Sequence, residues 1–525
     1  MAQSEQNKHT QRVAEQVQHE ARTRDHRLKV GVVVVGALLL AAFLWAGLKE
    51  NVYTDWHHYQ LEYRKILKKK AKTKLGRKLH RDFDIRIRQV VIPELGVVDR
   101  CVSCHGGITD PRMTDVKNPH KIHPGQYLSQ HEVGKYGCTI CHRGQGRALV
   151  FSEAKAVGYH WPYPMLPKGL TQSSCGLCHS PAEVRSAGGD KYALGHRLFN
   201  RRGCVSCHKL YGRGGSLGPE LTREGWKAPQ EVPMKHVRGP KTLARWLYEH
   251  FQNPQRIVPG SQMPPPRLTT RQLEALTIYT LSLQNRDLPS KYLSPGKYLE
   301  LHRLRNPPEM TGKALVAQYC GTCHDTGNYG RYDAFYQRFI PAIRGPSFVQ
   351  LATPAYVDDA IRRGRPGTPM AAWAGGLKEP ELVKIRNYLL GRKVRPEVRL
   401  PAAVVTRAKD PSLVIQGDVR LGAAIFAKQC ASCHGPRGQG GLGPALANRV
   451  FVQNATDGFL QATIAHGRAD TAMPAFLGTH QGSYRTPQVN ALVAFVRSLG
   501  GGVRPNKTAP AGAPRQTGSR RRRTP

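Results

Sequence analysis

The 525-residue sequence has no cysteine outside a Cys-x-x-Cys-His run. A disulfide framework would leave cysteines at other spacings, and zinc sites do not require a histidine after every cysteine pair. The lack of unmatched cysteines therefore argues against both roles. The six runs instead predict covalent attachment of six c-type haems, in which two thiols bond to one porphyrin and the next residue, histidine, ligates its iron.

All twelve cysteines of the chain belong to these runs. The predicted attachment residues are Cys101, Cys104, Cys138, Cys141, Cys175, Cys178, Cys204, Cys207, Cys320, Cys323, Cys430 and Cys433. The predicted proximal iron ligands are His105, His142, His179, His208, His324 and His434. No protein residue stands out as catalytic.

Acidic residues are scarce. The sequence has 36 Asp and Glu against 79 Lys and Arg, which leaves a formal net charge of +43. A field of this sign attracts acidic partners and anionic surfaces. Nucleic acid is not predicted as a partner, because an exported haem protein does not meet it. The predicted partners are an acidic soluble cytochrome or oxidase as electron acceptor, and a membrane surface.

Only one long apolar run is present, the 19 residues from Val30 to Leu48. This length is close to the ~20 residues that cross a bilayer as a helix. A cleaved signal peptide is the alternative, but the run is long for a signal and a polar segment of 29 residues precedes it. We predict a single-pass anchor in the cytoplasmic membrane with the N-terminus inside. Haem attachment takes place outside the cytoplasm, so the haem-bearing part is predicted to be periplasmic.

The spacing of the runs predicts the domain organisation. The first three runs begin 37 residues apart, too close for separate cytochrome folds, whereas the last three begin 116 and 110 residues apart, which leaves room for one domain each. The predicted fold class is mainly α, with an N-terminal transmembrane helix, a loop-rich three-haem module and three helical domains. The predicted segments are a cytoplasmic segment (1–29), the transmembrane helix (30–48), a basic membrane-proximal connector (49–95), the three-haem module (96–185), three haem domains (186–295, 296–400 and 401–500) and a disordered basic tail (501–525).

Amphipathic patterns flank each of the last three runs and indicate an internal repeat. Leading helices are predicted at Tyr192–Arg201, Gly312–Tyr319 and Val419–Gln429, and closing helices at Thr270–Leu283, Glu379–Leu390 and Thr486–Leu499. Ahead of the first run, Asp84–Val91 is predicted to be a short strand or an extended strap.

Two further features recur in the repeats. Gly218–Leu221 and Gly443–Leu446 read Gly-Pro-x-Leu, and Gly345–Phe348 departs at its last residue. A methionine lies beside a proline late in each repeat, at Met263, Met370 and Met473, with the order reversed at Met370. In these features residues 190–285, 310–392 and 416–500 resemble class I cytochromes c. The resemblance implies that the proline carbonyl orients the proximal histidine and that the three methionines are sixth iron ligands. The alternative is that the methionines only fill gaps in the core.

The sixth ligands of the first three haems are less defined by the sequence. His120, His123, His131 and His160 lie between the runs, with Met113 and Met165 also available. We predict His123, His131 and His160 as ligands in bis-histidine coordination. Because axial methionine raises the reduction potential, this assignment predicts lower potentials near the membrane and higher potentials toward the C-terminus.

Three segments around the first two runs suggest a membrane complex. They are Ile92–Gly96, Val98–Arg100 directly before Cys101, and Gly137–Gly146. Here Phe83–Gly146 resembles multihaem cytochromes of bacterial quinol-oxidising cytochrome bc-type complexes. The resemblance implies a cytochrome b-type subunit and a Rieske iron–sulfur protein as partners. This chain would then take the place of cytochrome c1 and pass electrons to a downstream cytochrome or terminal oxidase.

Two alternatives stay open. The chain could be a haem subunit of alternative complex III or of an oxidase-linked complex. It could also be a multihaem reductase, which needs an iron with an open coordination position. Unaltered proximal histidines in all six runs, with a methionine at the matching point of each C-terminal repeat, argue against a reductase.

Overall fold

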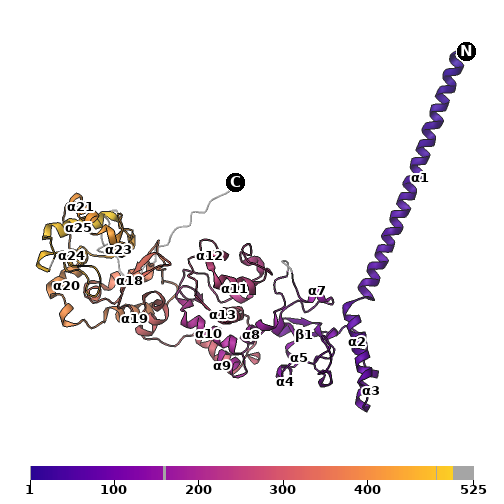
Figure 1. Ribbon diagram of the computed structural model, residues 1–525, viewed down its shortest axis with the longest axis horizontal. Helices are drawn as coiled ribbons and strands as arrows, with labels where there is room; N and C mark the ends of the chain where they lie inside the picture. The colour runs from indigo at the N-terminus through magenta and orange to yellow at the C-terminus, as the bar shows by residue number, and fades with distance from the viewer. Residues whose placement is uncertain (1, 158–160, 481, 501–525) are drawn as a thin grey trace. The chain divides into compact units, whose positions relative to one another are not determined.

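The computed structural model describes residues 2–157, 161–480 and 482–500 (Figure 1). These residues form two compact units, one ending at Leu166 and one beginning at Pro167. The predicted three-haem module, 96–185, spans this division, so its third run belongs to the second unit. The predicted tail, 501–525, lies outside the described residues.

The elements of the first unit are α1 (Ala2–Asn51), α2 (Asp55–Lys69), α3 (Lys74–Arg81), β1 (Val90–Ile92), β2 (Val97–Asp99), α4 (Tyr127–Gln130), α5 (Val133–Tyr136), α6 (Thr139–His142) and α7 (Phe151–Ala154). The polar segment and the apolar run form one continuous helix, α1. Its part from His9 to Asn51 is long and apolar enough to cross a membrane, and none of its most apolar stretch is buried in the protein. This agrees with the predicted anchor.

The basic connector folds as α2 and α3. One face of α2 is buried and carries Gln60, Tyr63 and Leu67. The Gln60 side-chain amide donates to the Ser103 carbonyl at 3.0 Å and accepts from the Arg86 N–H at 2.9 Å. A buried amide that satisfies both its groups fixes α2 against the first Cys-x-x-Cys-His run. The strand expected nearby is shorter than predicted, since only 90–92 pairs, antiparallel with 97–99.

The second unit holds three helical regions in chain order. Residues 167–305 form α8 (Gln172–Cys175), α9 (Pro181–Ser186), α10 (Asp190–Arg201), β3 (Lys209–Leu210), β4 (Arg213–Gly214), α11 (Leu243–Gln252), α12 (Pro254–Ile257), α13 (Thr270–Ser282) and α14 (Pro295–Arg305). Residues 306–400 form α15 (Gly312–Leu315), α16 (Gly321–His324), β5 (Arg331–Asp333), β6 (Arg338–Ile340), α17 (Pro346–Leu351), α18 (Pro354–Arg363) and α19 (Glu379–Leu390). Residues 401–500 form α20 (Ala402–Lys409), α21 (Val419–Gln429), α22 (Ala431–His434), α23 (Arg449–Asn454), α24 (Asp457–His466) and α25 (Thr486–Leu499).

The predicted leading and closing helices are present in all three regions. Those at 419–429, 379–390 and 486–499 have the predicted bounds. The helix predicted at 312–319 is instead a short α-helix that continues as a π-helical turn, Val316–Cys320. In the first region the helix begins at Asp190, two residues early, and its closing helix ends at Ser282, one residue early.

A glycine marks where the leading helix crosses the closing helix in every region. A Cβ atom on Gly195, Gly312 or Gly422 would lie 2.0, 2.2 or 2.1 Å from a carbonyl oxygen of the closing helix. A side chain at any of these positions would force the two helices to shift apart, so glycine allows the close crossing. The same device at three equivalent positions supports the predicted repeat.

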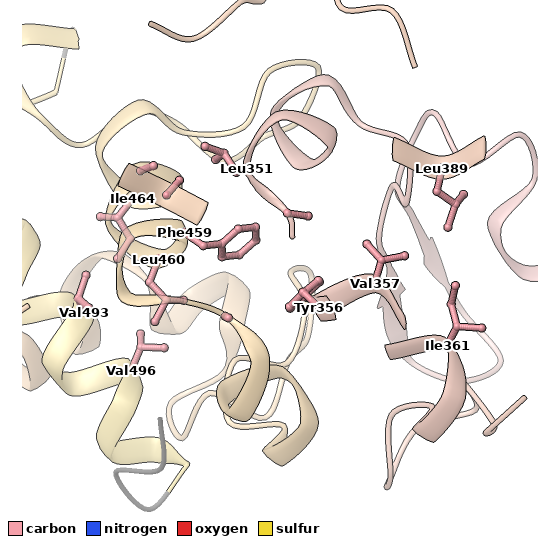
Figure 2. Close-up of a cluster of buried hydrophobic side chains, with 14 of the residues drawn as sticks. Leu351, Tyr356, Val357, Ile361, Leu389, Phe459, Leu460, Ile464, Val493 and Val496 are labelled. Carbon is pink, nitrogen blue, oxygen red and sulfur yellow. The ribbon is translucent and has the colours of Figure 1, made fainter. Parts of the chain in front are cut away.

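The second and third regions share one hydrophobic core. A continuous cluster runs from Leu315 through Ile385 to Val496, and the rings of Tyr356 and Phe459 stack across the two regions with centroids 5.4 Å apart (Figure 2). The first region has separate clusters of its own, around Trp246 and around Tyr192. Regions two and three are therefore packed as a pair.

We expect Gly422→Ala to loosen the crossing of α21 and α25, because the added methyl group overlaps the Ala491 carbonyl. Overpacking of this kind costs about 1–3 kcal/mol. Hydrogen exchange followed by mass spectrometry on the full chain should show lower protection in these two helices. Gly134→Ala in α5 is the matched control, because no atom lies within 4 Å of the added Cβ. Equal protection in both variants would contradict the crossing argument.

Candidate haem sites

Each Cys-x-x-Cys-His run forms a single helical turn. The histidine N–H donates to the first cysteine's carbonyl in five runs, at 2.9 Å from His105, His179, His208 and His434 and at 3.0 Å from His142. Residues three and four apart lie on one face of such a turn. The turn therefore directs both thiols and the ring of the histidine to the same side, and none of the twelve cysteines forms a disulfide.

A proline carbonyl accepts a hydrogen bond from the Nδ1 atom of four of the proximal histidines. The distances are 3.1 Å from His105 to Pro119, 2.8 Å from His208 to Pro219, 3.0 Å from His324 to Pro341 and 2.8 Å from His434 to Pro444. This bond fixes the ring orientation and leaves Nε2 as the coordinating atom. Burial lowers the pKa of each of these four rings despite the proline contact, which favours the neutral imidazole that a metal requires.

The middle region uses a proline other than the predicted one. His324 bonds to Pro341, whereas Pro346 of the predicted Gly345–Phe348 segment is the first residue of α17. The difference arises from the hairpin of β5 and β6, which ends at Ile340 and returns the chain to the histidine there. The prediction of Gly345–Phe348 as the orienting segment is therefore wrong, while those for Pro219 and Pro444 are confirmed.

The three predicted methionine ligands lie in closely similar loops. The N–H groups of Met263, Met370 and Met473 each donate to a hydroxyl two residues earlier, in every case at 3.2 Å. In the last two loops the methionine carbonyl also accepts the N–H of Arg365 at 2.8 Å or of Arg468 at 3.0 Å. Met370 therefore lies in a loop of the same form as that of Met473, although its neighbouring proline is on the other side. A Ser/Thr-x-Met pattern is common to all three loops and is a further signal in the sequence.

The first two runs touch each other in the first unit. The Cys101 and Cys138 sulfurs and a carboxylate oxygen of Asp99 all lie within 4.8 Å of one another. The same carboxylate accepts the N–H groups of Cys138 at 2.5 Å and Thr139 at 2.8 Å, together with the Thr139 hydroxyl at 2.7 Å. Through these three bonds Asp99 caps the second run.

The fourth and fifth runs touch each other in the second unit. The hydroxyls of Ser206 and Thr322, which occupy the same position in their runs, are 2.9 Å apart. Nearby, Arg213 and Glu381 form an ion pair at 2.5 Å whose two side chains are 13% and 14% exposed. The Tyr336 hydroxyl donates to the Gln262 carbonyl, next to Met263, at 3.1 Å. The first and second regions are thus joined at their attachment runs.

The third run is held by Glu183. This carboxylate accepts from the Ser180 N–H and hydroxyl, both at 2.8 Å, from the Ser294 hydroxyl at 2.5 Å, and from the Gly296 N–H at 3.0 Å. Ser180 follows the proximal His179 directly, and the other two donors begin α14. Glu183 therefore joins the third run to the last helix of the first region.

The histidines predicted as sixth ligands of the first three haems differ in their surroundings. The rings of His123 and His142 have centroids 6.2 Å apart, and His123 Nδ1 bonds to the Pro124 carbonyl at 2.9 Å. Two imidazoles on one metal, each at about 2 Å, have centroids roughly 6 Å apart. His131 bonds to the Tyr127 carbonyl at 3.1 Å, and its ring contacts Tyr136. His160 lies outside the described residues.

Two further histidines, His120 and His250, have buried ring nitrogens without a hydrogen-bond partner and are candidate ligands that the sequence did not predict. His120 is 3% exposed, and neither ring nitrogen has a hydrogen-bond partner, although a Glu62 carboxylate oxygen lies 3.5 Å from Nε2. In the first region, burial lowers the pKa of His250 to about 4, with a smaller effect from His208. Its Nδ1 is also buried without a partner. Only the tertiary structure identifies such nitrogens, because the burial of a side chain cannot be predicted from a single residue of the sequence.

These features fit covalent haem. None of the twelve cysteines is in a disulfide, the proximal rings present Nε2, and both ring nitrogens of the buried His120 lack a hydrogen-bond partner. Comparison with known families agrees. The family model described as "Cytochrome c" matches residues 192–284, and the one described as "Cytochrome C oxidase, cbb3-type, subunit III" matches residues 307–389 and again 417–496. The chain is a multihaem c-type cytochrome.

Curated relatives of this cytochrome resemble part of it. "Cbb3-type cytochrome c oxidase subunit FixP" of Bradyrhizobium sp. (strain ORS 278) is 30% identical over 200 residues, which cover 36% of this chain and 61% of that protein. "Cbb3-type cytochrome c oxidase subunit CcoP" of Azospirillum sp. (strain B510) is 24% identical over 241 residues, 41% of this chain and 71% of that protein. The chain thus spans about three-fifths of the length of the FixP relative.

One solved structure also aligns. It is the Kuenenia stuttgartiensis reducing HAO-like protein complex Kustc0457/Kustc0458, with 18% identity over 37% of this chain and 98% of that chain. The TM-score is 0.25, so the likeness supports no inference about this cytochrome.

We expect acid to loosen the third run through Glu183. Burial raises the pKa of Glu183, but its hydrogen bonds from Ser294, Ser180 and Gly296 outweigh burial and lower the pKa from 4.5 to about 2. A folded-state pKa below the unfolded one contributes stability above about pH 4.5 that is lost as the pH falls toward 2. Protection of α9 and α14 in hydrogen exchange, corrected for intrinsic rates, should therefore fall over this range.

Glu183→Gln should lower that protection already at pH 6 and remove most of its pH dependence. Glu397→Gln is the control, because the Glu397 side chain is 62% exposed. Wild-type behaviour of the Glu183 variant would contradict the assignment.

Proposed function

We propose that this chain is a membrane-anchored cytochrome with six covalently bound haems c that transfers electrons from a quinol-oxidising membrane complex to a downstream cytochrome or terminal oxidase. The observation that carries the proposal is the contact between attachment runs, Cys101 with Cys138 and Ser206 with Thr322. Direct contact between runs keeps redox centres close, which electron transfer requires and independent binding sites do not. Haem iron, when bound, supplies a one-electron couple.

In this proposal the side chains of the protein hold the haems and supply their iron ligands. Each run would provide two attachment cysteines and a proximal histidine. We propose His123 as the sixth ligand opposite His142, on the strength of the 6.2 Å centroid separation. His120, buried beside His105, is a candidate for the first site, and His131 and His160 stay predicted ligands. Met263, Met370 and Met473 are proposed as the sixth ligands of the last three.

The proposed orientation places residues after α1 on the periplasmic side of the cytoplasmic membrane, because covalent haem attachment takes place outside the cytoplasm. Basic residues crowd the first two elements beyond the anchor, where α2 ends in Lys68 and Lys69 and α3 has Lys78, His80 and Arg81 in its last turn. Such residues suit anionic lipid headgroups or an acidic partner subunit.

The two halves of the chain favour different partner subunits. The resemblance of Phe83–Gly146 favours a cytochrome b-type subunit and a Rieske iron–sulfur protein as the source of electrons. A second candidate is an oxidase-linked subunit. It is favoured by the match of residues 307–389 and 417–496 to a family described as an oxidase subunit, and by the single core these regions share.

Isolation of the native complex tests these alternatives. We expect gently solubilised membranes to yield one haem-staining complex in which mass spectrometry identifies this chain together with a cytochrome b and a Rieske protein. The isolated chain itself should carry a mass increase of six haems. Oxidase subunits in place of the cytochrome b and the Rieske protein would favour the oxidase-linked candidate. A chain that elutes without any membrane partner would contradict both.

Carbon monoxide binding tests the coordination of the first unit. Removing His123 opens one iron, so His123→Ala should bind one more equivalent of carbon monoxide per reduced chain than the unaltered protein. His302→Ala, an exposed histidine of α14, is the control. No gain in the His123 variant would contradict the assignment, and binding to the unaltered chain would favour a reductase.

A further inference from the structure

The loops of Met370 and Met473 each form a hydrogen bond with the other region of the pair. In the Met473 loop, the N–H of Ala469 donates to the Ser347 hydroxyl of α17 at 2.9 Å. In the Met370 loop, the Pro366 carbonyl accepts from the Asn448 side-chain amide, at the start of α23, at 3.1 Å. Ala469 and Pro366 occupy the same place in their loops, one residue after the arginine that bonds to the methionine carbonyl. The two contacts are therefore reciprocal.

These contacts reach buried parts of the interface. Ser347 is 5% exposed, and the Arg468 guanidinium lies over the Phe348 ring of the second region at 5.8 Å and over the Phe459 ring of its own region at 5.4 Å. Asp470, also in the Met473 loop, pairs with Arg395 at 3.0 Å. The loop of one region is thus built into the surface of the other.

The two methionine loops contain no helix or strand between Gly364 and Met370 or between Gly467 and Met473. Each loop is closed by hydrogen bonds among its own residues: the arginine N–H donates to the methionine carbonyl, the threonine N–H and hydroxyl donate to the arginine carbonyl, and the methionine N–H donates to the threonine hydroxyl. Segments without regular structure open at low free energy. The internal bonds fix the shape of the loop, whereas the bond to the neighbouring region ties the loop to a second body and so restrains the position of the methionine.

We propose that Ser347 and Asn448 are positioning residues, each of which holds the methionine loop of the opposite region so that the reduction potential of each haem depends on its neighbour's fold. The inference rests on the proposed function, in which Met370 and Met473 are sixth iron ligands. Axial methionine raises the potential of a c-type haem relative to other ligation. A loosened loop weakens the iron–sulfur bond and lowers that potential.

Because the contacts are reciprocal, a substitution in one region is expected to change the potential of the haem in the other region. Ser347→Ala lies in the second region but should lower the potential of the haem attached at Cys430 and Cys433. Asn448→Ser lies in the third region but should lower the potential of the haem attached at Cys320 and Cys323. Serine keeps a side-chain oxygen that can cap α23 by accepting the Phe451 N–H, and it removes the amide donor without adding a charge. Ser347→Thr, which retains the hydroxyl, should restore wild-type behaviour.

The experiment is a potentiometric titration of the full-length, fully haem-loaded chain, followed by magnetic circular dichroism in the near infrared, where methionine-ligated ferric haem has its own band. Gln453→Ala is the matched control. Its side chain accepts from Arg363 at 3.1 Å across the same interface but does not touch either methionine loop. Each haem is assigned beforehand with Met370→His and Met473→His.

A fall in one potential, or loss of one methionine band, in the opposite region's haem supports the inference. Unchanged potentials in Ser347→Ala and Asn448→Ser overturn it, as do equal shifts in those variants and in Gln453→Ala, which would indicate general weakening of the interface. If the unaltered chain shows no methionine band, the ligand assignment fails and the inference fails with it. Those two kinds of failure are distinguishable, because the second is seen before any variant is made.

Discussion

The hydrogen bond from a proximal histidine ring to a proline carbonyl joins each of four attachment runs to a loop between 10 and 17 residues further along the chain. A single helical turn can place two thiols and a ring on one side, but it cannot stop the ring from rotating. An acceptor outside the turn is needed, and a carbonyl in a loop is the nearest available group. The hairpin of β5 and β6 and the turns after the other runs have this one task in common.

The few acidic residues occupy structural junctions. In a chain of net charge +43, Asp99 caps the second run, Glu183 ties the third run to α14, and Glu249, 1% exposed, binds Arg245 and Arg256. Asp457, 2% exposed, holds Arg497 at 2.6 Å. A buried carboxylate with several donors is costly to leave unpaired. The excess of 79 Lys and Arg over 36 Asp and Glu leaves the protein strongly basic, which suits an acidic partner or an anionic membrane surface.

The regions of the second unit depend on one another to different degrees. The second and third share a hydrophobic core and exchange contacts between their methionine loops, whereas the first keeps its own core and meets the second through polar contacts at the attachment runs and through Val205. A shared core resists separation, since exposing it costs about 25 cal/mol per Å² of apolar surface. A polar junction holds the runs in register without that requirement, and it leaves the first region a distinct folding element.

The predicted attachment residues, the anchor helix and the leading and closing helices follow from the sequence alone, because spacing and periodicity are local properties that each segment carries within itself. So does the prediction of Met263, Met370 and Met473 as sixth ligands, since a repeated position is visible in three copies. Tertiary structure decided which proline orients His324, because Pro341 reaches the ring only through a hairpin. It also decided that the third run belongs with the second unit, and that His120 is buried without a hydrogen-bond partner. Each of these depends on contacts between residues distant in the chain, and no local pattern in the sequence encodes them.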